Sequence, residues 1–225
     1  MSGGVLRRLW TARLVAAAAA IGIVPVVMVS TDGRAAPAYR ARPAQTVMPA
    51  SYYGMEEAER DSGLLREVVL GMHNDEREAL GVSPLTWDDG LALDAARYAR
   101  EMAQTNLFRH SPRSSRALPS GENLWMGPRR LYDYEVMIGS FLDEKRLFRR
   151  GGKLPNISVS GRWADVGHYS QMIWRGTRKI GCALGEGRNY DYFVCRYFPA
   201  GNVFGQGPLD AADGPRPAQL AGGER

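Results

Sequence analysis

Apolar residues recur at helical spacing in three segments of the chain, and these segments predict three helices. The first spans residues 62–80, and Gly81 stands where the C-terminal cap of a helix is expected. The second begins after Asp88 or Asp89, either of which could accept hydrogen bonds from free backbone N–H groups. The third spans residues 131–148. The apolar stripes of the three helices are Leu65, Val68, Val69, Met72 and Leu80; Leu91, Ala95, Tyr98, Ala99 and Met102; and Tyr134, Met137, Ile138, Phe141 and Phe148.

Two β-like segments further along the chain, 179–184 and 192–198, predict a hairpin. The residues expected to form its turn are Gly185, Gly187 and Asn189. Adjacent antiparallel strands bring opposing Cβ atoms close together, so this hairpin predicts a disulfide between the two cysteines of the chain, Cys182 and Cys195.

Two other segments have no clear period. Residues 151–162 are predicted to form a surface loop because apolar and polar positions follow no helical or strand pattern there. Residues 169–174 fit a short helix or a short strand, and periodicity does not decide between them over so few positions.

The N-terminal region has the order of a secretory signal peptide. Three arginines within the first 13 residues precede an apolar stretch without charged residues over 14–29, and small residues follow at 35–38. The apolar stretch is shorter than the ~20 residues that span a bilayer, and Pro25 interrupts it. We therefore expect residues 1–38 to be a cleaved leader that sends the protein outside the cell or into the periplasm or cell envelope.

The rest of the chain divides into three parts by composition. Residues 39–60 are rich in Ala, Pro, Tyr and Arg and predict a linker. Residues 61–207 carry the periodic segments and predict one folded domain. Residues 208–225 are rich in Pro, Gly and Ala and predict a disordered tail.

The charge of the chain argues against a nucleic-acid partner. The formal net charge is +5, but the predicted leader contributes +3 of it, which leaves about +2 after cleavage. A basic cluster remains at Arg146, Arg149, Arg150 and Lys153. This cluster fits either a peripheral contact with an anionic membrane or an ordinary solvated face.

Several motifs around the histidines and the last strand follow one another in a distinctive order. His110-Ser111-Pro112 is followed by Gly121-Glu122-Asn123-Leu124, and His168 begins His168-Tyr169-Ser170-Gln171-Met172-Ile173-Trp174. His73-Asn74 with Arg77, and Pro84-Leu85-Thr86-Trp87, precede them, and Tyr197-Phe198-Pro199-Ala200-Gly201-Asn202 ends the series. Together these segments resemble the CAP family (cysteine-rich secretory, antigen 5, pathogenesis-related 1; the SCP domain). The variants His110-Ser111-Pro112 and Tyr197-Phe198-Pro199 are most similar to its Golgi-associated pathogenesis-related branch.

The resemblance implies an α+β fold, a three-layer α-β-α sandwich with a small, mainly antiparallel central sheet. It also implies a cleft lined by two His and two acidic residues, which map onto His110, Glu122, His168 and Glu144. The fourth position departs from the family pattern, because Phe141 replaces the Trp that the family usually has three residues before the Glu. Asp143 is therefore a rival to Glu144.

These four side chains suit zinc or another divalent cation, since imidazole nitrogens and carboxylate oxygens are good ligands for it. Two arrangements fit the residues: all four bind the metal, or the two His bind it while the carboxylates hold the ring N–H groups. A third interpretation has no metal, and the His and Glu pairs only connect the helices to the sheet. His73 lies on the buried side of its helix and is expected to be a structural histidine.

Three classes of function remain open. The resemblance implies a secreted carrier of a lipid, a sterol or another small ligand, which we favour because no Ser or Cys nucleophile paired with a His is evident. The alternatives are a metal-dependent, peptidase-like hydrolase with Glu122 as the candidate catalytic base, and a defence or interaction module without turnover.

Overall fold

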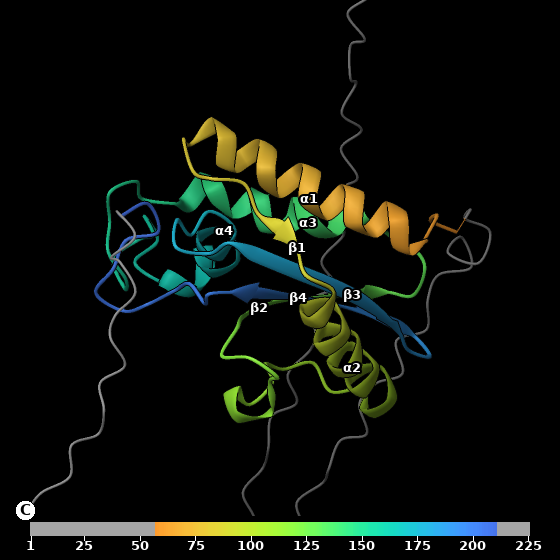
Figure 1. The fold of residues 1–225 in the computed structure, drawn as a ribbon. Helices are drawn as coiled ribbons and strands as arrows, with labels where there is room; N and C mark the ends of the chain where they lie inside the picture. Colours follow the sequence, from red (N-terminus) through yellow and green to blue (C-terminus); the bar gives the residue numbers. More distant parts are fainter. Residues whose placement is uncertain (1–56, 211–225) are drawn as a thin grey trace, which may run out of the picture. The chain divides into compact units, whose positions relative to one another are not determined.

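The computed structural model describes residues 57–210 and has three layers (Figure 1). A four-stranded sheet in the order β1-β3-β4-β2 forms the middle layer, and helices cover both of its faces. β1 (Thr86–Trp87) pairs in parallel with β3 (Lys179–Glu186), whereas β4 (Tyr190–Phe198) pairs antiparallel with β3 and with β2 (Gly121–Pro128). The α-β-α sandwich with a mainly antiparallel sheet is therefore confirmed.

α1 (Ser62–Ala79) lies on one face of the sheet beside α3 (Tyr134–Leu142) (Figure 1). The side chain of Asp61 accepts hydrogen bonds from two backbone N–H groups of its first turn. The helix ends at Ala79 with Leu80 as its C-cap, and Gly81 follows with φ +65°, a conformation that glycine adopts without a Cβ penalty. The predicted first helix and its terminating glycine are confirmed.

α2 (Asp89–Thr105) covers the opposite face, and Asp88 is its N-cap. This helix lies very close to β3, because a Cβ on Gly181 would come within 2.2 Å of the Ala92 nitrogen, and one on Gly185 within 2.4 Å of the Ala99 oxygen. The two glycines and Ala183 between them leave the strand's α2 side without large side chains, so the backbone of the helix can approach it.

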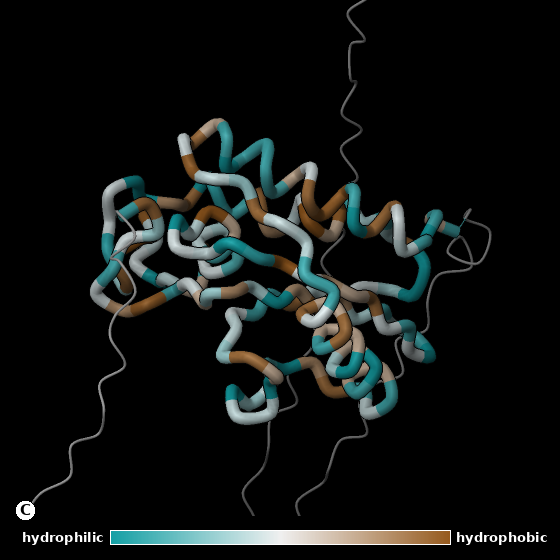
Figure 2. Tube along the Cα trace, viewed as in Figure 1, coloured by the Kyte–Doolittle hydropathy of each residue, from teal (hydrophilic) through white to brown (hydrophobic). Residues whose placement is uncertain are grey.

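The strand β4 contributes alternately to two hydrophobic cores, as the twofold period of a strand requires. Phe193, Cys195 and Tyr197 pack with the α1 and α3 side, while Tyr192 and Val194 pack with α2. Figure 2 shows the matching alternation of hydrophobic and hydrophilic positions along the two long helices. β3 alternates in the same way, with Ile180 and Cys182 in one core and Ala183 in the other, so both central strands pack against both helical layers.

The predicted third helix is shorter than its apolar stripe suggested. Asp133 caps α3, which ends at Leu142, and the chain continues as a 3₁₀ helix over Asp143–Leu147. The predicted start at residue 131 was wrong because the side chain of Asp133 accepts a hydrogen bond from the N–H of Val136 and fixes the helix start. Glu144 lies in this 3₁₀ helix, and its carboxylate contacts His168.

The hairpin extends further than predicted, since β3 continues through Gly185 to Glu186. Gly185 is thus a strand residue, and the turn lies between Glu186 and Tyr190. Cys182 and Cys195 are directly opposed partners of β3 and β4, and the predicted disulfide between them is present.

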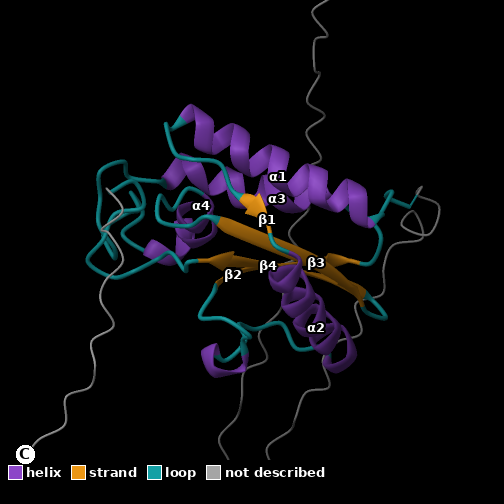
Figure 3. Ribbon diagram, viewed as in Figure 1, coloured by secondary structure: helices purple, strands orange, loops and turns teal. Residues whose placement is uncertain are grey.

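Two regions without clear periodicity are now defined. Residues Gly167–Met172 form the short helix α4, preceded by a 3₁₀ turn at Trp163–Val166 (Figure 3). The segment 151–162 is irregular, as predicted, but it does not lie wholly on the surface. Leu154 and Ile157 are buried in a third hydrophobic core together with Val166 and Trp174, so these two side chains anchor the segment to the domain.

Both ends of the described chain contact the domain. Arg60 pairs with the buried Asp191 at 2.8 Å, and Arg175 donates to the carbonyl of Leu209 at 3.0 Å. The side chain of Leu209 also packs against the main hydrophobic core, so residues 60 and 209 both contact the folded unit. The predicted leader and most of the predicted linker and tail lie outside the described residues.

Among the described helices, none combines the length and apolar character that crossing a bilayer would take.

Candidate functional site

A cleft of about 450 Å³ opens where the start of β2, the loop after α2 and the helix α4 meet. His110, Glu122 and His168 all line it, although they come from three separate elements. The expected convergence of these three residues is therefore observed. Glu144 stands behind His168, which it contacts from the 3₁₀ helix after α3.

His110 and Glu122 form the first histidine–carboxylate pair. Nδ1 of His110 lies 2.6 Å from Oε1 of Glu122. The imidazole is 63% exposed whereas the carboxylate is 1% exposed, so Glu122 holds the ring at its buried edge and leaves the other edge open to solvent. A carboxylate only accepts hydrogen bonds, so Nδ1 carries a hydrogen and Nε2 is the atom left free.

Glu122 is itself held by several donors. Its oxygens accept from the backbone N–H of Ser111 at 3.0 Å and from the hydroxyl of Ser111 at 2.7 Å. The guanidiniums of Arg116 and Arg196 also pair with it. Burial alone would raise the pKa of Glu122, but the hydrogen bonds and these two positive charges outweigh burial and hold the pKa below its usual range.

Arg196 connects this pair to α2. It is 2% exposed, and its Nε lies 2.9 Å from Oδ2 of Asp94, an α2 residue that is also buried. Its guanidinium carbon lies 5.4 Å from the centre of the Tyr98 ring. Asp94 and Arg196 were absent from the sequence prediction, although a charged residue within the strongly apolar segment 192–198 was a signal for a buried polar contact.

His168 and Glu144 form the second pair, with Nδ1 2.6 Å from Oε1. The other oxygen of Glu144 accepts the backbone N–H groups of His168 at 2.9 Å and Tyr169 at 3.0 Å, at the start of α4. Phe141 stacks on the imidazole with ring centres 4.7 Å apart. Thus Glu144, rather than Asp143, is the carboxylate at His168, and Phe141 supplies an aromatic surface in place of the family's Trp.

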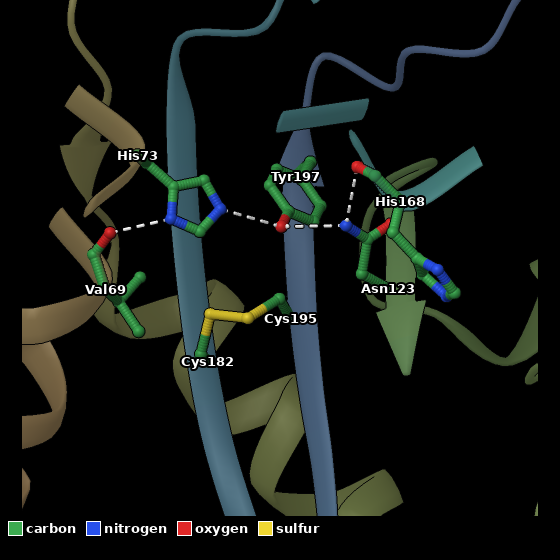
Figure 4. Close-up of a disulfide and its surroundings, with 7 residues drawn as sticks. All are labelled: Val69, His73, Asn123, His168, Cys182, Cys195 and Tyr197. Carbon is green, nitrogen blue, oxygen red and sulfur yellow. Dashed lines mark hydrogen bonds between the residues drawn. A yellow bond between two sulfur atoms is a disulfide. The ribbon is translucent and has the colours of Figure 1, made fainter. Parts of the chain in front are cut away.

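A chain of hydrogen bonds connects α1 to the backbone of His168 (Figure 4). His73 contacts the carbonyl of Val69 at 2.7 Å and the hydroxyl of Tyr197 at 2.9 Å. Asn123 donates to that hydroxyl and to the carbonyl of His168, each at 3.1 Å. His73 is fully buried and does not reach the cleft, which agrees with the structural role predicted for it.

The atoms left for a metal in this cleft are few. Within residues 57–210, no three His, Cys, Asp or Glu side chains gather closely enough to hold a metal ion between them. Both carboxylates are occupied by hydrogen bonds, whereas Nε2 of His110 and Nε2 of His168 have no partner among the described residues. Of the two metal arrangements, only the one with two His ligands is compatible with the occupied carboxylates, and the interpretation without a metal is compatible with the same contacts.

The hydroxyl of Ser111 is the nearest candidate nucleophile. It donates to Glu122 and accepts hydrogen bonds from Arg116 and Arg196, each at 2.9 Å. No hydrogen bond joins it to an imidazole among the described side chains. Two guanidiniums and a carboxylate therefore saturate this hydroxyl. The base that contacts its proton is Glu122, a weak base because its pKa is held below the usual range, and not a histidine.

Comparison with known proteins places the chain in a family. Residues 70–197 match the model of the cysteine-rich secretory protein family, CAP. Pathogenesis-related protein 1B of Nicotiana tabacum is 35% identical over 140 residues, 62% of this chain and 77% of that protein. Golgi-associated plant pathogenesis-related protein 1 of Homo sapiens is 34% identical over 140 residues, 62% of this chain and 85% of that protein.

Solved structures agree with these matches. The crystal structure of NaASP2 with Zn2+ superposes with a TM-score of 0.54 at 26% identity, covering 66% of this chain and 88% of that one. BmVAL-1 has the same fold with a TM-score of 0.52 at 22% identity, covering 66% and 83%. By sequence and by fold, the chain belongs to the cysteine-rich secretory protein (CAP) family.

Proposed function

We propose that this protein is an exported binding protein whose cleft holds a small ligand, with a divalent cation at Nε2 of His110 and Nε2 of His168. One observation carries the proposal. Each imidazole that lines the cleft has its Nδ1 fixed at 2.6 Å by a carboxylate, which leaves Nε2 as the free ring nitrogen.

This arrangement is the usual one for histidine ligands, which donate their other ring N–H to a carboxylate or a carbonyl. The partner carboxylate fixes the ring orientation and makes the free nitrogen a better donor of its electron pair. A bound cation would supply positive charge and open coordination positions for a ligand. The related protein NaASP2 has been crystallised with Zn2+, which supports the same metal here.

Binding is favoured over hydrolysis by the state of Glu122. A general base works best with a pKa near the working pH, and the pKa of Glu122 lies below its usual range. Both carboxylate oxygens of Glu122 are also engaged, by Ser111, Arg116 and Arg196. The peptidase-like alternative would need Glu122 to leave this cluster during the reaction.

Export is supported by the disulfide. Cys182 and Cys195 are bonded, and structural disulfides persist in oxidising compartments outside the cytosol. The leader-like pattern of residues 1–38 points the same way.

The metal is tested by titrating chelator-treated protein with zinc in a calorimeter. We expect one site, lost in His110→Gln and in His168→Gln, and weakened about 10–100-fold in Glu144→Gln because a neutral amide supports the His168 ring less strongly than the carboxylate does. Each variant is first checked for its thermal midpoint, since a change that unfolds α4 would also abolish the site. Absence of zinc uptake by the folded wild-type protein would refute the metal part of the proposal.

The hydrolase alternative is tested on the same samples. Zinc-loaded protein is incubated with fluorogenic peptide and ester mixtures, and Glu122→Gln serves as the comparison. Turnover by the wild type that disappears in a folded Glu122→Gln protein would favour the hydrolase. Equal, background-level signals in both would favour the binding protein or a defence module without turnover.

A further inference from the structure

The cleft contains side chains that a cation at the two histidines would leave unused. Arg113, Trp163 and Phe204 all line it. The rings of Trp163 and Phe204 meet edge to face, with centres 5.9 Å apart and planes at 77°. Phe204 is nevertheless 63% exposed, so much of its ring has no protein neighbour.

The charge of the cleft is positive. Glu122 is the one carboxylate in its lining, and two guanidiniums already neutralise it. Arg113 is exposed and, among residues 57–210, makes no side-chain hydrogen bond or ion pair. One full positive charge on the cleft wall is therefore left without a counterion.

An exposed arginine alone would be an ordinary solvated residue, and an exposed phenylalanine alone would be unremarkable on a protein surface. Here both border the same concave site, and three of its polar lining residues, Glu122, Asn123 and His168, lie in β2 and α4. A concave site with an apolar wall and a few placed polar groups is the usual form of a small-molecule site. The two features together specify a ligand with opposite properties at its two ends.

We propose that the cleft binds a small organic anion, with its phosphate or carboxylate group at Arg113 and its flat apolar part on the Trp163–Phe204 pair. This inference names the ligand class for the binding function proposed above and rests on that function. It does not need the cation, because Arg113 supplies a permanent charge and the aromatic pair supplies apolar surface. A guanidinium binds either anion through charge-assisted hydrogen bonds.

The test uses phenyl phosphate and inorganic phosphate on chelator-treated, metal-free protein, with binding followed by calorimetry. We expect phenyl phosphate to bind about tenfold more tightly than inorganic phosphate, since only the former has a ring to bury. Arg113→Gln should weaken phenyl phosphate about tenfold. Phe204→Ala should remove the advantage of the ring and leave inorganic phosphate unchanged.

Two exposed residues of α2 provide matched controls. Leu93 is 73% exposed, and Arg100 lines a different groove, so Leu93→Ala and Arg100→Gln should bind both probes as the wild type does. Benzoate in place of phenyl phosphate distinguishes a carboxylate ligand from a phosphate ester. Binding of either aromatic anion that depends on both Arg113 and Phe204 supports the proposal.

The anion inference fails if neither aromatic anion binds at millimolar concentration, or if binding is unchanged in both Arg113→Gln and Phe204→Ala. Zinc titration of the same two variants keeps this failure apart from failure of the metal site. Both should take up zinc as the wild type does, because neither residue contacts His110 or His168 through a hydrogen bond. If the wild-type protein binds the aromatic anion but takes up no zinc, the proposed metal site is refuted and the anion inference stands.

Discussion

The hydroxyl of Tyr197 lies 2.9 Å from Nε2 of His73, and the hydrogen bond between them has one direction. The carbonyl of Val69 accepts from Nδ1, so in the neutral ring Nε2 has no hydrogen and Tyr197 must donate. The hydroxyl oxygen then accepts from Asn123, which also donates to the carbonyl of His168. A neutral His73 is therefore built into the bonds that reach the cleft.

Stability should fall on acidification because of His73. Burial, the main cause, and the charge of Arg77 lower its pKa from 6.5 to about 4, despite the opposing bond to Val69. A lowered pKa means that the unfolded chain binds the proton more readily than the folded protein does. The stability that neutral His73 contributes is therefore fully present above pH 6.5 and is lost as the pH falls toward 4. Over that window we expect a loss of about 3 kcal/mol in the free energy of unfolding.

Urea denaturation at pH 7.5 and pH 4.5 measures this loss, and His73→Gln is the comparison. Other groups, including Glu122 with its lowered pKa, also respond to acid, so the informative quantity is the difference between the two proteins. The variant should lose less stability between the two pH values than the wild type. Equal losses would mean that His73 does not titrate as described.

Arg77→Lys should be strongly destabilising although the charge is kept. The fully buried guanidinium donates to the carbonyls of Ser83, Met172, Trp174 and Thr177, at 2.8–3.0 Å. An ammonium group has its donors on one atom and cannot reach this spread of acceptors. We expect a loss of about 2–4 kcal/mol by urea denaturation. Arg66→Lys, at an exposed position of the same helix, should change little, and similar values for both variants would contradict the role of Arg77.

Two glycine-to-alanine changes should have opposite effects. A Cβ on Gly71, at an exposed position inside α1, meets nothing within 4 Å, so Gly71→Ala should stabilise the protein by about 0.5–1 kcal/mol. A Cβ on Gly185 would come within 2.4 Å of the Ala99 oxygen, which belongs to the backbone of α2. Gly185→Ala should therefore lower the thermal midpoint, while Gly71→Ala raises it. A neutral Gly185→Ala would show that α2 can move away from β3 without cost.

Replacing both cysteines by alanine should destabilise the protein. The bond joins residues 13 apart, and closing a loop of that length in the unfolded chain is worth about 3 kcal/mol in the chain-entropy model. The wild type should show a lower denaturation midpoint in reducing buffer, and the Cys182→Ala/Cys195→Ala protein should not respond to the reductant. A wild-type midpoint that ignores the reductant would argue against the contribution.

The parts of the fold that were predictable have local patterns. α1 and α2 have long apolar stripes with a capping Asp, and the hairpin has two apolar runs around a glycine-rich turn. β2 was not predicted, because Gly121–Pro128 contains two glycines, a glutamate and an asparagine and has no simple alternation. It becomes a strand by pairing with β4 along its whole length, which is a tertiary effect.

The candidate site divides in the same way. His110, Glu122, His168 and Glu144 stand in recognisable motifs, so they could be named from the sequence. The Asp94–Arg196 pair that holds Glu122 could not be named from the sequence. Its two residues are about a hundred positions apart and meet only after α2 packs on the sheet. The choice between Glu144 and Asp143 likewise depended on the 3₁₀ turn that follows α3.

Because successive side chains of β4 enter different environments, only one alignment of β4 with its neighbouring strands satisfies all of them. A slip by one residue would exchange the environments of Arg196 and Tyr197, placing a guanidinium among the apolar side chains beneath α1 and removing the counterion of Glu122. The same slip would move Cys195 away from Cys182, so the covalent link could not form. A wrongly aligned hairpin would thus bury an unpaired charge, lose core packing and lack the disulfide. The sheet and the site around Glu122 therefore reach their correct arrangement together.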